Sequence, residues 1–195
     1  MSVSEEARQI ARVLADTFRV GAAAKATPQM HRYGDETDRS TIDLLSCVNS
    51  PMKGITAYGT VRLSDHTLDN DSDLRAEIIG AFPTAVPAFA NVITTCAFNV
   101  INDNAPLFPG AIHGEALGLY ELSPTLRHIL FVSPFLWEHR PETLTLPDRK
   151  VAWLMAVPIT EAERAYTAIH GSRALEEIFE QKDIDIFDVE RPSVV

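Results

Sequence analysis

The stretch VAWLMAVPITEAERAYTAIHGSRALEEIFEQKDIDIFDVERPSVV, from Val151 to Val195, joins an apolar run to an amphipathic helical pattern and an acidic end. The run from Val151 to Val157 is continuously apolar, which is typical of a strand covered on both faces. We therefore expect it to be central in the sheet. Pro158 is expected to close this strand, because proline cannot donate a ladder hydrogen bond. The segment from His128 to Trp137 is almost as apolar and is predicted to be a second central strand.

Two helices are predicted after the Val151–Val157 strand. Thr160 is a favourable N-cap residue, and two glutamates follow it in the first turn, where negative charge is stabilised. Gly171 and Ser172 interrupt the helical pattern, and a second short helix is expected over residues 173–182.

The N-terminal half predicts two more helices. Residues 4–20 form an amphipathic pattern, and the spacing of Ser2 and Glu5 matches a capping box at its start. The segment between Ile78 and Asn102 contains no Asp, Glu, Lys or Arg, and from Phe89 onward its apolar residues recur at helical spacing. An uncharged helix of this kind is predicted to be largely covered by the rest of the fold.

Strands are predicted between these helices. Residues 42–48 and 55–63 are expected to pair antiparallel across a turn-rich linker, and the second of them alternates as a strand with two different faces would. A further strand is expected over residues 75–82. The Pro- and Gly-rich connection over residues 102–124 is predicted to be irregular, with a short strand near residues 117–122.

Composition limits the class of protein. A chain of 195 residues, 46% hydrophobic and 23% charged, is most simply one globular domain. The net charge of −10 disfavours a nucleic-acid partner, because phosphate contacts need a basic face. No run approaches the ~18 apolar residues of a membrane span, and the acidic-polar N-terminus lacks signal-peptide layout, so a cytoplasmic location is expected. Cys47 and Cys96 are predicted to be buried free thiols.

Motifs for metals and catalysis are weak. The spacing Asp69-x-Asp71-x-Asp73 copies the opening of a calcium loop, but Leu74 and Gly80 occupy the positions of the required Gly and Glu. A solvated acidic loop is the better interpretation. The histidines lack zinc-ligand spacing, and no Gly-x-Ser-x-Gly motif is present. We therefore expect no metal, no cofactor and no catalytic residue.

A pocket lined by His113, Glu115 and Tyr120 is the best candidate for a ligand site or an enzyme, and it remains an open alternative. Two acidic patches are the other candidate sites. They comprise Asp65, Asp69, Asp71 and Asp73 in one loop, and Glu176, Glu177 and Glu180 in the second C-terminal helix. Such patches are commonly solvated surface, but they also suit a surface that attracts a basic protein partner.

Four segments carry a resemblance to a known family: TAYGTVRLSD (residues 56–65), FANVITTCAFNVIND (89–103), HILFVSPFLWE (128–138) and the closing VAWLMAVPITEAE…DIDIFDVERPSVV. They resemble the bacterial suppressor-of-fused (SUFU) domain family, most strongly over residues 30–195. The resemblance implies one SUFU-like domain over residues 1–195. Its fold class would be α+β (mixed α/β), with a twisted, mostly antiparallel sheet flanked by helices.

The same resemblance implies binding without a cofactor or catalysis. Stand-alone bacterial members are commonly interpreted as immunity proteins, or antitoxins, that bind and neutralise a cognate toxin, and the acidic balance suits a basic nuclease as that toxin. In animals the domain belongs to a regulator that grips an extended peptide as an added strand. The alternative function is therefore a regulatory interaction module that sequesters an endogenous protein or peptide by strand addition. An enzyme ranks third.

Overall fold

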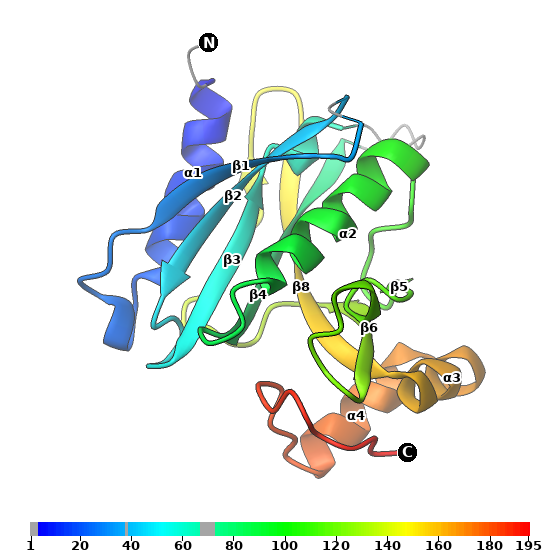
Figure 1. Cartoon of the computed structure of the whole chain (residues 1–195). Coiled ribbons are helices and arrows are strands. Elements are labelled where there is room, and N and C mark those ends of the chain that lie inside the picture. The colour runs from blue at the N-terminus through cyan, green and yellow to red at the C-terminus, as the bar shows by residue number, and fades with distance from the viewer. Residues whose placement is uncertain (1–3, 38, 67–72) are drawn as a thin grey trace.

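The structure is a computed structural model that describes residues 4–37, 39–66 and 73–195. Its centre is an eight-stranded sheet in the order β1-β2-β3-β4-β8-β6-β5, with β7 paired to β8 (Figure 1). The strands are β1 (Gln29–Gly34), β2 (Thr41–Val48), β3 (Ile55–Val61), β4 (Leu74–Pro83), β5 (Ile112–His113), β6 (Leu126–Val132), β7 (Leu144–Thr145) and β8 (Lys150–Thr160). Within the described ranges only β4 and β8 pair parallel, which confirms the predicted mostly antiparallel α+β sheet.

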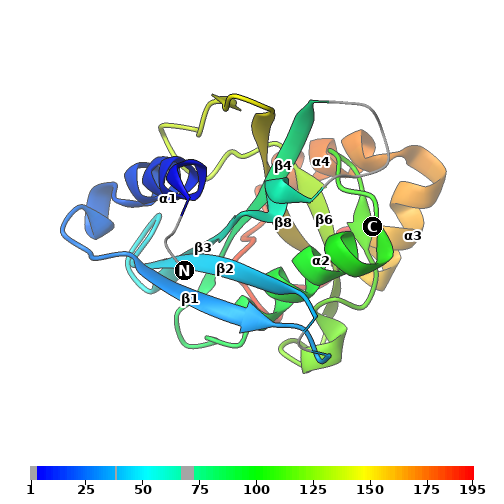
Figure 2. The same ribbon diagram turned by 90° about the horizontal axis from the view of Figure 1, so that it is seen from above.

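Helices cover both faces of this sheet. They are α1 (Glu5–Phe18), α2 (Phe89–Asp103), α3 (Glu161–His170) and α4 (Ser172–Gln181), and the short 3-10 turns are η1 (Gly21–Ala23), η2 (Leu63–Asp65) and η3 (Gly118–Tyr120). α1 and α2 lie on opposite sides of the strands, and α3 and α4 pack at the end where β8 finishes (Figures 1 and 2). No helix in the described part of the chain is long and apolar enough to cross a membrane.

Two hydrophobic cores result, one on each face of the sheet. β2, β3, β4, β6 and β8 each contribute residues to both cores; in β2, for example, Leu45 packs with α1 and Leu44 packs with α2. β3 is buried along its whole length, although its alternation allowed one solvent-facing side. Gly59 in β3 permits the close approach of α1, because a Cβ atom there would lie 2.7 Å from Cδ2 of Leu14.

The predicted helices are confirmed with small shifts at their ends. Ser4 is the N-cap of α1 and its hydroxyl accepts the amide of Ala7, whereas Ser2, the predicted cap, lies outside the described residues. Thr160 caps α3 in a full capping box with Glu163. The uncharged helix α2 is mostly buried, as its composition predicted.

Two predictions about the apolar strands are wrong. Pro158 does not close β8: it pairs with Ile129 inside the ladder, and the strand continues to Thr160. A proline at a position where its missing N–H is not needed leaves the ladder intact. β6 is next to the sheet edge rather than central, and its burial comes from the helices and cores that cover it.

The apolar segment after β6 is also not a strand. β6 ends at Val132, and the chain leaves the sheet toward Trp137, whose ring is buried beside Phe18 with 5.1 Å between ring centroids. The indole N–H of Trp137 donates to the hydroxyl of Ser50 at 3.1 Å. The hydrophobicity that predicted a strand therefore reflects a buried loop residue.

The short strand predicted near residues 117–122 is wrong as well. This segment forms η3, and Glu121 after it has a positive φ of 50°. The extended residues of this connection are instead Ile112 and His113, which pair with β6. Tertiary pairing with β6, rather than local propensity, selects which residues are extended.

Candidate partner-binding surface

The two described residues of the first acidic patch, Asp65 and Asp73, both form internal ion pairs. Oδ1 of Asp65 lies 2.6 Å from Nη2 of Arg149, and its Oδ2 lies 2.8 Å from Nε of Arg62. Asp73 lies 3.6 Å from the ammonium group of Lys150. The other two predicted residues of this patch, Asp69 and Asp71, lie outside the described residues. Asp65 is therefore a structural ion-pair residue rather than the freely solvated acidic group that was expected.

The second acidic patch is less neutralised. Glu177 pairs with Arg173 at 3.4 Å. Glu176 and Glu180 form no ion pair with any residue that the structure describes, and the same holds for nearby Asp183. Partial burial and the neighbouring charge of Glu180 raise the pKa of Glu176, and Arg173 opposes this. This part of α4 therefore presents carboxylates that are in no ion pair with a described residue, although Arg173 acts on Glu176 at longer range.

A groove of about 400 Å³ lies beside α4, and Glu176, Glu180 and Asp183 are among the residues that line it. We call it the α4 groove. Its apolar lining includes Phe135 from the loop after β6 and Phe179 from α4. Arg140 is the basic residue among those that line it. The groove thus combines an apolar wall with acidic lining residues, which is the pattern expected of a surface that receives a basic and apolar partner.

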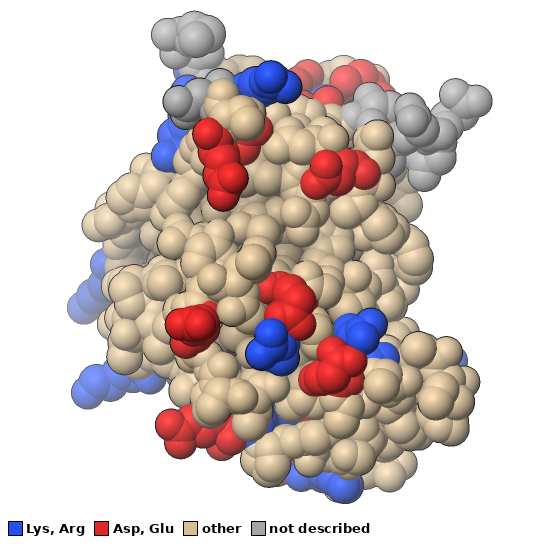
Figure 3. All heavy atoms as spheres, turned by 45° about the vertical axis from the view of Figure 1, so that its right-hand side comes forward, with Lys and Arg blue, Asp and Glu red and all other residues tan. Residues whose placement is uncertain are grey.

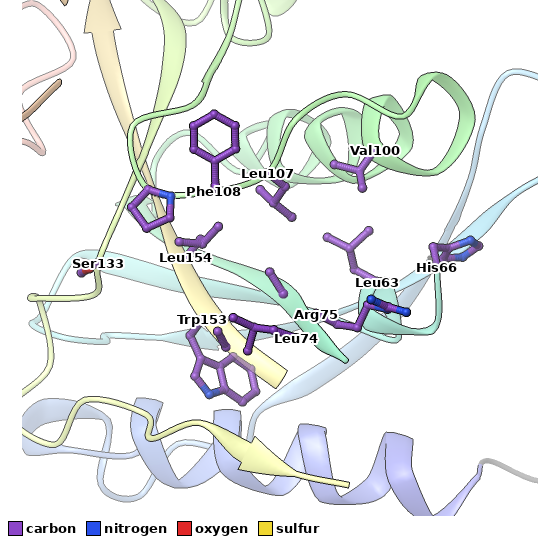
Figure 4. Close-up of a pocket in the computed structure, with 13 residues that line it drawn as sticks. Leu63, His66, Leu74, Arg75, Val100, Leu107, Phe108, Ser133, Trp153 and Leu154 are labelled. Atoms are coloured by element: carbon purple, nitrogen blue, oxygen red, sulfur yellow. The ribbon is translucent and has the colours of Figure 1, made fainter. Parts of the chain in front are cut away.

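A second hollow, of about 350 Å³, lies on the other face of the sheet (Figure 4). We call it the β4–β8 pocket, because residues near the start of β4 and in the first half of β8 line it, together with the end of α2 and the loop after it. Leu74 and Phe108 border it and are 51% and 55% exposed. Ser133 lines both this pocket and the α4 groove, so the two hollows meet at the end of β6.

The pocket predicted around His113, Glu115 and Tyr120 does not form. The buried His113 donates from Nε2 to the carbonyl of Pro106 at 3.1 Å, and burial lowers its pKa. The Tyr120 hydroxyl is hydrogen-bonded to Thr95 at 2.6 Å. Glu115 lies on the surface. The three side chains line no shared cavity among those found in the described residues. The structure therefore does not support the ligand or enzymatic site that the sequence suggested there.

A charged cluster around His128 was missed by sequence reasoning. Nδ1 of the buried His128 accepts the amide N–H of Glu115 at 2.9 Å, so Nε2 carries the proton and donates to Glu161 at 2.7 Å. Arg127 binds the Glu115 carboxylate, and Arg164 binds that of Glu161. Figure 3 shows acidic and basic side chains side by side on this face.

This cluster links α3 to β6 and is poorly suited to a metal. The nearest ligand atoms of Glu115, His128 and Glu161 lie within 4.8 Å of one another, which is close enough for a cation. However, both carboxylates already bind arginines, and Nδ1 of His128 is occupied. The pKa of Glu161 is lowered to about 2, chiefly by its hydrogen bond with Arg164. Only the fold brings these residues together, since His128 and Glu161 alone are 33 positions apart in the sequence.

The two cysteines are buried free thiols, as predicted. Burial raises the pKa of the Cys96 thiol strongly and raises that of Cys47 as well. A thiol that stays protonated is a poor nucleophile. Neither residue therefore adds a reactive group to the candidate surface.

The edge of the sheet is a further possible contact surface. β1 pairs with β2 on one side only, and five of its six residues are exposed. An edge strand of this kind has unpaired backbone groups along its outer side. It therefore offers a place where an extended peptide can add as another strand.

Comparison with known proteins adds family information. The sequence profile of the family described as Suppressor of fused protein (SUFU) matches residues 38–192. Immunity protein YqcF of Bacillus subtilis (strain 168) is 41% identical over 198 residues, which include the whole of both chains. This identity over the full length of both chains, together with the family match, is sufficient to show a common family.

Solved structures of low identity share the fold. A SUFU homolog from Neisseria gonorrhoeae FA 1090 superposes with a TM-score of 0.75 at 16% identity, and the match covers 98% of this chain and 97% of that one. The Sufu–Fu complex contains a chain that matches with a TM-score of 0.68 at 12% identity, covering 97% and 92%. These likenesses confirm the predicted SUFU-like architecture.

Proposed function

The chain belongs to the suppressor of fused (SUFU) family, and from this premise we propose that it is an immunity protein that binds and neutralises a cognate toxin. The observation that carries the proposal is the 41% identity with Immunity protein YqcF over the whole of both chains. In this function the protein acts stoichiometrically, by occupying a surface of the toxin inside the producing cell. It uses no cofactor and performs no catalysis.

The charge of the protein supports a basic toxin, such as a nuclease. The chain carries a net charge of −10, and electrostatic attraction between opposite surfaces accelerates association and favours the correct partner. The proposed contact residues are those of the two acidic patches, Asp65, Asp69, Asp71, Asp73, Glu176, Glu177 and Glu180. Among the described residues of this set, Glu176 and Glu180 are the strongest candidates, because neither forms an ion pair with another described residue.

Co-expression tests the function. A toxin domain encoded beside this gene is induced in a sensitive host, with this protein or with an unrelated immunity protein as control. We expect growth to be restored only by this protein, and the purified pair to form a one-to-one complex. A toxin that kills equally well in both strains, with no complex in solution, would show that the proposed function is wrong.

The exposed edge of β1 favours an alternative, which is a regulatory module that sequesters an endogenous protein by strand addition. Hydrogen exchange of the amides distinguishes the two functions. Strand addition would protect amides of β1, or of β5 at the other end of the sheet. Toxin binding at the acidic surface would instead protect α4 and leave both edges unchanged.

A further inference from the structure

We propose that the partner-binding surface is centred on Ser133, where the α4 groove and the β4–β8 pocket meet. It receives a protein segment that presents lysine or arginine beside large apolar side chains. This inference rests on the proposed function, which supplies the premise that the partner is a protein. It adds the location of the contact and the chemistry of the segment that binds.

The topology of the sheet creates this meeting point. β6 pairs with β8 as far as Val132 and Met155, and β7 pairs with β8 only from Val151 back to Lys150. Residues 152–154 of β8 therefore have no paired strand on that side within the described part of the chain. Ser133 is the first residue after β6 and is exposed. A hollow on each face of the sheet consequently opens at one place on its margin.

Exposed apolar side chains lie along this surface. Phe135 in the α4 groove is 48% exposed, and Phe108 and Leu74 at the β4–β8 pocket are also about half exposed. Large apolar groups left in water beside a concave surface are typical of protein-binding sites. Aromatic residues in pockets are also the side chains that most often dominate binding energy.

The charge at the groove defines the partner. Glu176, Glu180 and Asp183 line the α4 groove without ion pairs to described residues, and Arg140 is the basic side chain among the described residues of its lining. An approaching lysine or arginine would gain a charge-assisted contact with these carboxylates. An acidic segment or a nucleic-acid backbone would be repelled. The combination of apolar walls and unpaired carboxylates therefore selects a basic and apolar segment.

A peptide panel tests the location and the chemistry without the toxin. Peptides of about 15 residues alternate lysine or arginine with leucine, phenylalanine or tryptophan, and a matched set carries glutamate in place of each basic residue. Binding to the purified protein is measured by calorimetry and by shifts of backbone amide signals. We expect the basic set to bind and to shift Ser133, Phe135 and α4, and the acidic set not to bind.

Matched variants locate the contact. Phe135→Ser is compared with Leu119→Ser, which removes another exposed apolar side chain that lines neither hollow. The double variant Glu176→Lys/Glu180→Lys is compared with Glu36→Lys, and Ser133→Trp, which fills the junction, is compared with Ser133→Ala. We expect Phe135→Ser, the Glu176→Lys/Glu180→Lys double variant and Ser133→Trp each to raise the Kd for the peptide about tenfold or more. The Kd of each control variant should stay within about twofold of the wild-type value.

The outcomes are distinct. Absence of binding by every basic peptide, amide shifts confined to β1 or β5, or equal weakening by test and control variants would overturn the location. Equal binding of the acidic set would overturn the chemistry. A toxin neutralised by this protein while Phe135→Ser and Ser133→Trp leave the complex intact would retain the proposed function and reject this surface. Peptide binding at Ser133 without neutralisation of any toxin would retain this surface and reject the proposed function.

Discussion

Arg191 and Glu163 form a buried pair that ties the C-terminal segment to the rest of the fold. Nη1 of Arg191 lies 2.6 Å from Oε1 of Glu163, and Nη2 lies 2.9 Å from Oε2. Nη2 also donates to the carbonyl of Pro158 at 3.0 Å, and the Glu163 carboxylate accepts the amide of Thr160 at 2.8 Å. One carboxylate thus joins the end of β8, the start of α3 and the tail. The Arg191 guanidinium also lies over the ring of Phe179, which lines the α4 groove.

Loss of Arg191 should be strongly destabilising. Arg191→Ala would leave the buried Glu163 carboxylate without its cation, and we expect the free energy of unfolding to fall by about 3–5 kcal/mol. Urea denaturation measures the change. Arg173→Ala is the control, because Arg173 is 92% exposed and its pair with Glu177 lies on the surface. That variant should change stability by less than about 0.5 kcal/mol. A similar small loss for Arg191→Ala would contradict the proposed anchoring of the tail.

Stability should depend on pH through Glu77. Its carboxylate is fully buried and accepts the Thr60 hydroxyl and the amides of Arg62, Leu63 and Ser64. Burial raises the pKa of Glu77 from 4.5 to about 7, although these donors oppose the shift. Between these two values the folded protein binds a proton that the unfolded chain does not. The free energy of unfolding should therefore decrease as pH rises through this window, by up to about 3 kcal/mol.

The variant Glu77→Gln isolates this effect, because glutamine does not titrate. The free energy of unfolding of both proteins is measured by urea denaturation between about pH 5 and pH 8. The part of its pH dependence that Glu77 causes should be absent from the variant. Consequently, the free energy of unfolding of the wild type, relative to that of the variant, should decrease as pH rises. Parallel stability curves for the two proteins would show that Glu77 does not titrate in this range.

Close packing of α1 on β3 should make Gly59 intolerant of substitution. In Gly59→Ala the new methyl group would lie 2.7 Å from Cδ2 of the buried Leu14, and we expect a loss of about 1–3 kcal/mol. Adding Leu14→Ala should make the two losses less than additive, since the shorter side chain removes the clash. Gly114→Ala is the control, because the nearest atom to its Cβ is 4.0 Å away in His128. Additive losses in the double variant would place the strain elsewhere.

Zinc should not stabilise the cluster around His128. A cation there would have to displace the amide of Glu115 from Nδ1 of His128 and compete with two arginines for the carboxylates. We expect that a roughly tenfold molar excess of Zn²⁺ changes the Tm by no more than about 2 °C from its value without zinc. Calorimetric titration provides a second measurement. A rise in Tm that disappears in His128→Ala would identify a metal site and reject this interpretation.

The helices were predictable because their signals are local. The amphipathic pattern of α1, the uncharged run of α2 and the Thr160 cap of α3 each lie within a few turns of chain, where spacing alone defines the buried face. Strand order was not predictable in the same way. Continuous hydrophobicity in β6 and β8 indicates coverage on both faces, but a helix or a loop can provide that coverage as well as a neighbouring strand.

The candidate surface was predictable only in part. The acidic residues of α4 are visible in sequence, but their effective charge depends on which cations the fold brings near them. Asp65 forms an ion pair with Arg149, which is 84 residues away, whereas Glu176 and Glu180 form no ion pair with a described residue. The role of Ser133 has no sequence signal at all, because it arises from where β6 ends relative to β7.

By itself the sequence determined the fold class, the helices, the buried thiols and the SUFU resemblance, because each depends on residue types repeated at short spacing. The tertiary structure alone decided which charges remain unpaired, that the His113 pocket does not form, and that two hollows meet at Ser133. Those features depend on distances between residues far apart in the chain. Such distances are set by strand pairing and packing across the sheet, which local patterns do not specify.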